Sequence, residues 1–273
     1  MTRFARFSSV LTLGVIYCTM ATSQTQEPQR YSRVSCMKVK EGKDAEYAAY
    51  LRDVVAKLAR VRVDAGLFDS YAFQQAVIPA GKSATCDYRL AVVYVGFPPE
   101  GASRRELRDP EQVSADLKKA GIAMSREEML AKRDELATLV GMDIWRFHER
   151  VGTAQKGGYS RVNYDKIHPG MTAEWVRRMS TGWKPVAEAS SKEHGTAWRA
   201  ATLVMPGGSG LQYNATTVDH FPTWAQLAKG IDARTIWNKV HPDTDLAAFM
   251  NPGFSVFDRT RVDVYRMIEL ITK

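Results

Sequence analysis

The first half of the chain reads as strands separated by helical segments. Apolar side chains recur every three or four positions between residues 44 and 66, which is the pattern of an amphipathic helix. Residues 111–120 and 125–140 have similar spacing, and Ser125 followed by Glu128 has the order of a capping box. Four further segments alternate or are continuously apolar and predict strands: residues 31–39, 70–78, 86–97 and 143–151. The predicted order is β-α-β-β-α-β.

The same order of segments begins again at residue 159. Tyr-Ser-Arg-Val at residues 31–34 returns at residues 159–162, and a glycine leads into a helical pattern after each copy. Asp-Ile-Trp-Arg at residues 143–146 corresponds in the same way to Asp-Val-Tyr-Arg at residues 263–266. The spacing between matched segments falls from 128 to 120 residues, as expected when the connecting loops of the second copy are shorter. The sequence therefore predicts a tandem repeat.

The N-terminal residues have the features of a secretory signal peptide. Arg3 and Arg6 precede an apolar stretch at residues 10–20, and the small residues at 21–23 are typical of a cleavage site. The apolar stretch is too short to cross a bilayer, and an uncleaved anchor helix is the alternative. We expect a secreted or periplasmic protein. The predicted organisation is a signal peptide (1–23), a linker (24–30), a first ferredoxin-like repeat (31–151), a second linker (152–158) and a second ferredoxin-like repeat (159–273).

Composition and charge narrow the expected partners. The chain has 38 Lys and Arg against 30 Asp and Glu, and this formal charge of +8 favours anionic ligands. An ordinary solvated surface is the alternative explanation of the excess. The basic residues form no blocks interleaved with aromatic residues, so we expect no nucleic-acid partner. The expected partner is a small anionic or aromatic ligand, with no membrane contact after cleavage, and the pattern favours no particular oligomeric state.

Two such repeats can bury the sheet faces that a single repeat leaves exposed. A single β-α-β-β-α-β unit covers one face of its sheet with helices and leaves the other face bare. Two units bury the bare faces when they pack sheet to sheet. From residue 31 to residue 271 the chain resembles the dimeric α+β barrel superfamily, which includes antibiotic-biosynthesis-monooxygenase-like, NIPSNAP-like and haem-degrading proteins. The resemblance implies an α+β fold in which the two repeats form one fused barrel.

The pattern and the resemblance also limit the expected classes of function. We expect a small-ligand-binding or interaction module, and the resemblance makes a cofactor-free or haem-linked monooxygenase-like enzyme the alternative. The sequence itself indicates no cofactor, although the resemblance allows haem. It contains no HExxH pair, GxSxG motif or phosphate-binding loop, so it predicts no metal site and assigns no catalytic residue.

Two pairs of arginines occupy equivalent positions of the repeats and are candidate ligand-binding residues. These are Arg33 with Arg161, and Arg146 with Arg266. Strand alternation places the Arg33 and Val34 side chains on different faces of the same strand. We expect the apolar face with Val34 to meet the helices and the face with Arg33 to meet the partner sheet. All four arginines are then expected to gather in one pocket, where guanidinium groups can hold an anion. Structural ion pairs are the alternative, with these carboxylates as partners: Asp143, Glu149, Asp165 and Asp263.

Two of the five histidines, His148 and His220, lie in predicted strands. Each is a candidate ligand-binding residue, because related barrels use a strand or helix histidine as a base or as a haem ligand. A hydrogen-bonded structural histidine is the alternative in each case. The other three occur beside loop signals: His168, His194 and His241.

The two cysteines that follow the predicted signal peptide are expected to form a disulfide. In a β-α-β-β-α-β fold the first and third strands are antiparallel neighbours, so Cys36 lies near Cys86. Pairing the two cysteines in register places Val34 opposite Tyr88, and it places residue 32 opposite residue 90. These side chains are then expected on the apolar face under the helices. Two buried free thiols are the alternative.

Overall fold

The computed structural model describes residues 28–80, 83–96, 109–208 and 210–273. The predicted signal peptide (1–23) and residues 24–27 of the predicted linker lie outside these ranges. Within the described part of the chain, no helix has both the length and the apolar character needed to cross a membrane.

Half one, residues 28–151, contains the predicted succession of elements. The predicted helix at residues 44–66 is a continuous run of two α-helices joined by a π-helical turn. Ser125 caps the last helix as predicted, because its hydroxyl accepts from the Glu128 N–H and the Glu128 carboxylate accepts from the Ser125 N–H. In chain order the elements are β1 (Arg30–Val39), α1 (Asp44–Tyr50), η1 (Leu51–Val55), α2 (Ala56–Asp64), β2 (Ser70–Ile78), β3 (Tyr88–Val95), α4 (Pro110–Lys119), α5 (Arg126–Leu136) and β4 (Ala137–Val151).

The fourth strand is longer than the sequence pattern predicts. The helical spacing indicates a helix up to residue 140, but α5 ends at Leu136 and β4 begins at the next residue. The first part of β4 pairs with the end of β1, where Val39 lies opposite Ala137 and Met37 opposite Leu139. The prediction is wrong here because this pairing supplies backbone hydrogen bonds that helical spacing does not reveal.

Half two, residues 159–273, has the same plan with more helical turns before its last strand. The elements are β5 (Tyr159–Ile167), α6 (Thr172–Arg178), η3 (Met179–Trp183), α7 (Lys184–His194), β6 (Ala197–Met205), β7 (Ala215–Phe221), α8 (Trp224–Lys229), α9 (Ala233–Val240), α10 (Leu246–Met250), η4 (Asn251–Ser255) and β8 (Phe257–Thr272). Gly195 ends α7 in the left-handed conformation at φ 66°, which a residue with a Cβ rarely adopts.

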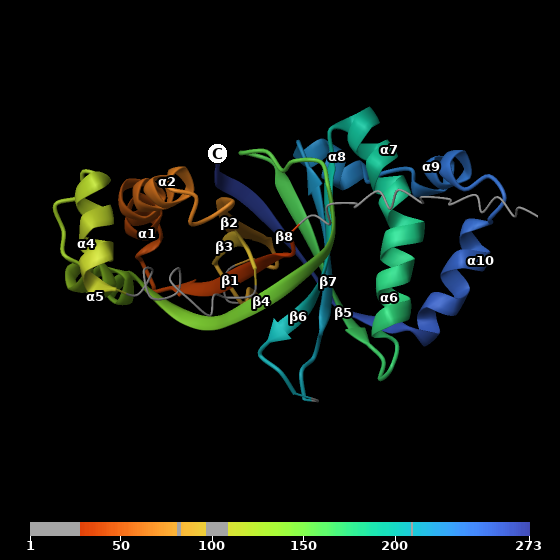
Figure 1. The fold of residues 1–273 in the computed structure, drawn as a ribbon, viewed down its shortest axis with the longest axis horizontal. Helices are drawn as coiled ribbons and strands as arrows, with labels where there is room; N and C mark the ends of the chain where they lie inside the picture. Colours follow the sequence, from red (N-terminus) through yellow and green to blue (C-terminus); the bar gives the residue numbers. More distant parts are fainter. Residues whose placement is uncertain (1–27, 81–82, 97–108, 209) are drawn as a thin grey trace, which may run out of the picture.

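The eight described strands close into one antiparallel barrel in the order β1-β3-β2-β8-β5-β7-β6-β4. Each half contributes the same internal order, β4-β1-β3-β2 and β8-β5-β7-β6, and the halves join where β2 meets β8 and where β4 meets β6. The helices of half one lie on one side of the barrel and those of half two on the other (Figure 1). The predicted α+β barrel is confirmed, and closure leaves no open sheet edge between the halves.

The barrel buries apolar residues on both of its faces. The interior holds a cluster that includes Val34, Trp145 and Tyr265, while Met37 packs with Tyr47 under the helices of half one. The expected faces of β1 are therefore reversed, because the Val34 side points into the barrel and the Arg33 side points toward the helices. An apolar residue does not identify the helix face when the interior is apolar as well, and an arginine stem can lie along an apolar surface.

The predicted disulfide is present and joins Cys36 to Cys86, whose Cα atoms are 5.1 Å apart. The predicted register is wrong by three residues: Val34 lies opposite Ala91, and Cys36 lies opposite Arg89. The bond still forms because Cys86 lies in the loop before β3 and reaches back toward β1. Tyr88 packs under the helices as expected, but an odd shift of the register separates the two faces, so Val34 lies inside the barrel and not beside Tyr88.

Candidate functional site

Two cavities lie on opposite faces of the same strands of half two. The interior cavity, of about 120 Å³, lies inside the barrel. The helix-side cavity, of about 310 Å³, lies between the outer face of β5 and β7 and the segment η3–α7. His220 on β7 stands at the wall between them and lines both.

The helix-side cavity combines aromatic walls with two arginine–carboxylate pairs. Arg161 Nε donates to Asp219 Oδ2 at 3.0 Å, and Asn163 Nδ2 donates to the same oxygen at 3.0 Å. Arg259 Nε donates to the buried Asp165 at 3.1 Å. Four aromatic residues line the same space: Trp183, Trp198, Phe221 and Phe257.

Half one fills the equivalent space with apolar side chains. In half one Arg33 lies opposite Val92 on the neighbouring strand. At the equivalent position of half two, Arg161 lies opposite Asp219. Val92 is 2% exposed and packs in the half-one core with Leu90. At the corresponding points half two has Asp219 and Thr217, both of which line the cavity. Half two therefore has shorter or polar residues at positions where half one has apolar core residues. These residues line the helix-side cavity.

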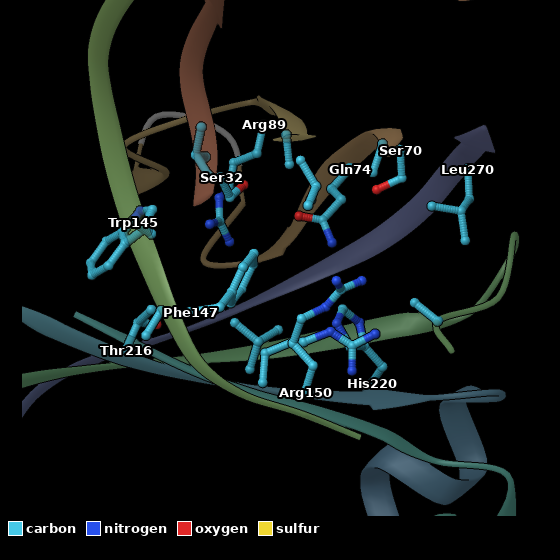
Figure 2. Close-up of a pocket in the computed structure, with 18 of the residues that line it drawn as sticks. Ser32, Ser70, Gln74, Arg89, Trp145, Phe147, Arg150, Thr216, His220 and Leu270 are labelled. Atoms are coloured by element: carbon cyan, nitrogen blue, oxygen red, sulfur yellow. The ribbon is translucent and has the colours of Figure 1, made fainter. Parts of the chain in front are cut away.

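A hydrogen-bond chain joins two residues that line the interior cavity, Gln74 and His220. Gln74 Nε2 on β2 donates to Ser160 Oγ on β5 at 2.9 Å, and Ser160 Oγ lies 2.8 Å from His220 Nδ1. Figure 2 shows Gln74, Arg150 and His220 converging on one side of the cavity, with Trp145 and Thr216 on the other. Burial, reinforced by Arg199 and then Arg89, lowers the pKa of His220 to about 3. His220 is therefore a neutral imidazole at physiological pH.

The end of the barrel interior beyond Arg89 is filled by a polar and aromatic network. The guanidinium of Arg89 lies over the Tyr265 ring at 4.8 Å. The Tyr265 hydroxyl donates to the buried Asp263 at 3.0 Å, and the Tyr213 hydroxyl donates to Asp143 at 3.0 Å. These contacts occupy the space between the strands, so the interior cavity is closed at this end.

The structure places two of the six predicted ligand-binding residues on the interior or the helix-side cavity, and a third, Arg266, on a shallow surface pocket. His220 lines both cavities, and Arg161 lines the helix-side cavity. His148 faces the helix side, where its Nε2 lies 2.8 Å from Thr202 Oγ1 and its ring packs edge-on against Trp175. Burial lowers the pKa of His148. This surrounding fits the structural alternative for His148.

The four candidate arginines do not gather in one pocket. Arg33 has a buried Nε with no hydrogen-bond partner among the described residues and stands on the helix side of half one. Arg146 is exposed and its Nε donates to Gln29 at 3.2 Å, while Arg266 lies on the outer surface beside Trp224. The expected cluster is wrong because all four side chains point out of the barrel, to separate places around it. Ligand binding by each of them singly stays a prediction.

Sequence reasoning missed the arginines of the interior cavity, which are Arg89, Arg150 and Arg199. A bulge in β4 between Phe147 and Glu149 explains why strand alternation does not identify Arg150 as an inward-pointing residue. Phe147 points inward, the bulge adds one residue, and Arg150 then also points inward, opposite Arg199. Strict alternation places Arg150 on the outer face with Arg146, because a bulge leaves no simple mark in the sequence.

Among the described residues there is no cluster of metal-ion ligands, and one histidine, His220, lines both cavities. No group of three His, Cys, Asp or Glu side chains within the described ranges can hold a metal ion. A haem needs an axial ligand, and both described cysteines are in the disulfide. His220 lines both cavities, of about 120 Å³ and about 310 Å³, and pockets for drug-sized ligands are roughly 300–1,000 Å³. Met179 and Met250 line the helix-side cavity together with His220, and a methionine ligand of haem is normally paired with a histidine.

The fold is a closed α+β barrel, built by two halves of the same strand order in one polypeptide. No family model and no curated protein matches the sequence. Solved structures do match in fold. A "putative monooxygenase" from Lactobacillus acidophilus NCFM aligns with a TM-score of 0.52 at 10% identity, over 90% of this chain and 97% of its own. A second "putative monooxygenase", from Fusobacterium nucleatum, aligns with a TM-score of 0.53 at 12% identity, over 91% and 96%. At such identities the likeness shows the fold alone.

The lowered pKa of His220 predicts an acid-labile fold. Between pH 6.5 and pH 5 the unfolded chain takes up a proton at this histidine and the folded chain does not, so this group lowers stability by about 1–2 kcal/mol as pH falls. His220→Gln should remove that loss, as measured by urea unfolding at the two pH values. His168→Gln is the control, because Asp258 raises the pKa of His168 and its contribution grows as pH falls. An unchanged pH slope in His220→Gln would contradict the assignment.

Proposed function

We propose that this protein binds a small molecule in the helix-side cavity of half two. The observation that carries the proposal is the contrast between the halves. Core positions that are apolar in half one, Leu90 and Val92, are Thr217 and Asp219 in half two, beside a space of about 310 Å³. Polar residues at core positions lower stability unless they are hydrogen-bonded, and their convergence on a cavity is typical of a ligand site.

The lining indicates an aromatic or apolar ligand that carries one anionic group. Trp183 and Trp198 supply aromatic surface, and such rings favour flat apolar ligands. Arg161 and Arg259 border the same space, and a guanidinium fork suits a carboxylate or sulfonate. Each guanidinium already contacts an aspartate, so the anion would share its arginine through the remaining N–H donors.

A matched pair of dyes tests the proposal. Anilinonaphthalene sulfonate and the uncharged phenylnaphthylamine have the same ring system, and both become fluorescent in an apolar site. We expect saturable binding of both dyes. Arg161→Met should weaken the sulfonate about tenfold, near 1.4 kcal/mol, and change the uncharged dye less than about twofold.

Arg33→Met is the control, because Arg33 occupies the equivalent position over the filled core of half one. It should leave both affinities unchanged. Two results would count against the proposal: no saturable binding of either dye, or equal weakening by the two substitutions.

An oxygenase-type enzyme is the second candidate, and the names of the two structural neighbours favour it. A cofactor-free reaction would use the same cavity, with an arginine holding a substrate anion. Consumption of dissolved oxygen in the presence of an anionic aromatic compound would support this candidate. Binding without oxygen uptake supports a binding protein.

We infer further that the protein is secreted or periplasmic and that its halves arose by tandem duplication. The Cys36–Cys86 disulfide supports export, because such bonds persist in oxidising compartments. The duplication is supported by the shared strand order and by the π-helical turns, which begin at Leu51 and at Met179, 128 residues later. Membership of the antibiotic-biosynthesis-monooxygenase-like or NIPSNAP-like branch remains a prediction.

A further inference from the structure

A shallow pocket lies on the outer surface of the barrel, where the two halves join between β2 and β8. We call it the joint pocket. Residues of β2, β5 and β8 and the first residue of α8 line it: Gln75, Ala76, Val77, Tyr159, Trp224 and Arg266. We infer that the joint pocket binds an acidic sugar, that is, a uronic acid residue of a larger saccharide.

Strand register brings three of the lining side chains into one row. Arg266 on β8 lies opposite Gln75 on β2 and, on its other side, opposite Tyr159 on β5. Residues directly opposite each other on paired strands point to the same face of the sheet, so the three side chains share the outer face. The Trp224 ring meets the Tyr159 ring edge to face, with centroids 5.3 Å apart. The pocket therefore has an aromatic corner beside a guanidinium and an amide.

The equivalent joint between β4 and β6 binds its own side chains. Arg146 corresponds to Arg266 there, and it lies opposite Tyr31 on β1. The Arg146 Nε donates to Gln29 at 3.2 Å, and the Tyr31 ring stacks on Tyr94 with centroids 6.4 Å apart. The arginine and the tyrosine of this joint therefore already have partners within the protein.

The joint pocket leaves its polar groups available to a ligand. Among the described residues, the Arg266 guanidinium, the Gln75 amide and the Tyr159 hydroxyl have no hydrogen-bond or ion-pair partner. Trp224 is 44% exposed, and none of the six lining residues carries a carboxylate. Guanidinium and indole N–H groups are donors only. A ligand at this place should therefore bring hydrogen-bond acceptors and negative charge.

The surroundings favour a sugar over a peptide. At this point β2, β8 and β5 are each paired on both sides, so a peptide cannot add to the sheet as a further strand. The pocket is also too shallow to enclose the large anchor side chain on which a protein partner normally depends.

The chemistry of a uronic acid matches the lining. One face of a sugar ring consists of C–H groups, and these pack on the negative face of an indole ring. The hydroxyls at the rim of the sugar can bond Gln75 and Tyr159, and the carboxylate matches the guanidinium fork of Arg266. A simple aromatic acid would use the guanidinium but leave the amide and the hydroxyl without partners.

Trigalacturonate is the probe, added to the full chain and followed by calorimetry and saturation-transfer NMR. We expect saturable binding, and binding at least tenfold weaker for its methyl ester, which keeps the rings and hydroxyls but lacks the charge. Arg266→Met should weaken trigalacturonate about tenfold, the loss expected for a charge-assisted hydrogen bond, and leave the ester unchanged. Trp224→Ala should weaken both sugars, because both use the ring face. Arg146→Met is the control and should change neither affinity, since Arg146 occupies the equivalent position of the other joint.

Three results would overturn the inference: no saturable binding of trigalacturonate, equal binding of the methyl ester, or the same weakening by Arg146→Met as by Arg266→Met. Binding of tetraglutamate but not of trigalacturonate would make the pocket a peptide site and reject the sugar. Arg266→Met should leave both dye affinities unchanged, because the dyes are expected in the helix-side cavity. Failure of dye binding therefore leaves the joint pocket standing, and failure of trigalacturonate binding leaves the helix-side cavity standing.

Discussion

Replacing Cys36 and Cys86 together by serine is expected to lower the free energy of unfolding by about 4 kcal/mol. The disulfide spans 50 residues, and in the chain-entropy model closing a loop of that length raises the free energy of the unfolded state by about this much. The bond ties β1 to the loop that leads into β3, two central strands of half one. Loss of the bond should therefore destabilise the whole barrel.

Urea unfolding with and without a reductant measures the effect. The wild-type protein should lose about the same free energy when reduced as the serine variant loses by substitution. The serine variant itself should not respond to the reductant, which controls for other effects of the reagent. Alkylation of both cysteines in denatured, never-reduced protein would contradict the presence of the bond.

The sequence was sufficient to predict the order of elements and the class of fold. Apolar spacing separated strands from helices, and the repeated Tyr-Ser-Arg-Val segment identified two halves of equal plan. The faces of the strands could not be predicted in the same way. In a closed barrel both faces are buried, so Val34 inside and Met37 outside are equally apolar. Hydrophobicity alone carries no information about which face is which.

The candidate site was predicted only in part, for reasons that depend on single residues. The sequence indicates His220 because it is one of two histidines in predicted strands, and in the structure it lines the interior cavity with Thr216 and Val218. Arg150 was missed because the bulge after Phe147 changes the phase of β4. Asp219 became informative only when register placed it opposite Arg161, at the point where half one has Val92.

The fragment of residues 28–152, expressed alone, is expected to form dimers or aggregates and not a folded monomer. In the full barrel β2 pairs with β8 and β4 pairs with β6, so removal of half two leaves two strands with unpaired backbone groups. It also exposes the interior face with Val34, Trp145 and Phe147. Open strand edges beside an apolar face promote association.

Size-exclusion chromatography with light scattering gives the mass of the fragment, and circular dichroism reports its fold. Mixing the fragment with residues 159–273 is the control, because the two partners can restore both joints of the barrel. The mixture should yield a soluble one-to-one complex with the spectrum of the intact chain. A stable, folded monomer of the fragment would mean that the joints β2–β8 and β4–β6 add little to the fold. The closed barrel predicts the opposite, since those two joints are the only strand pairings between the halves among the described residues.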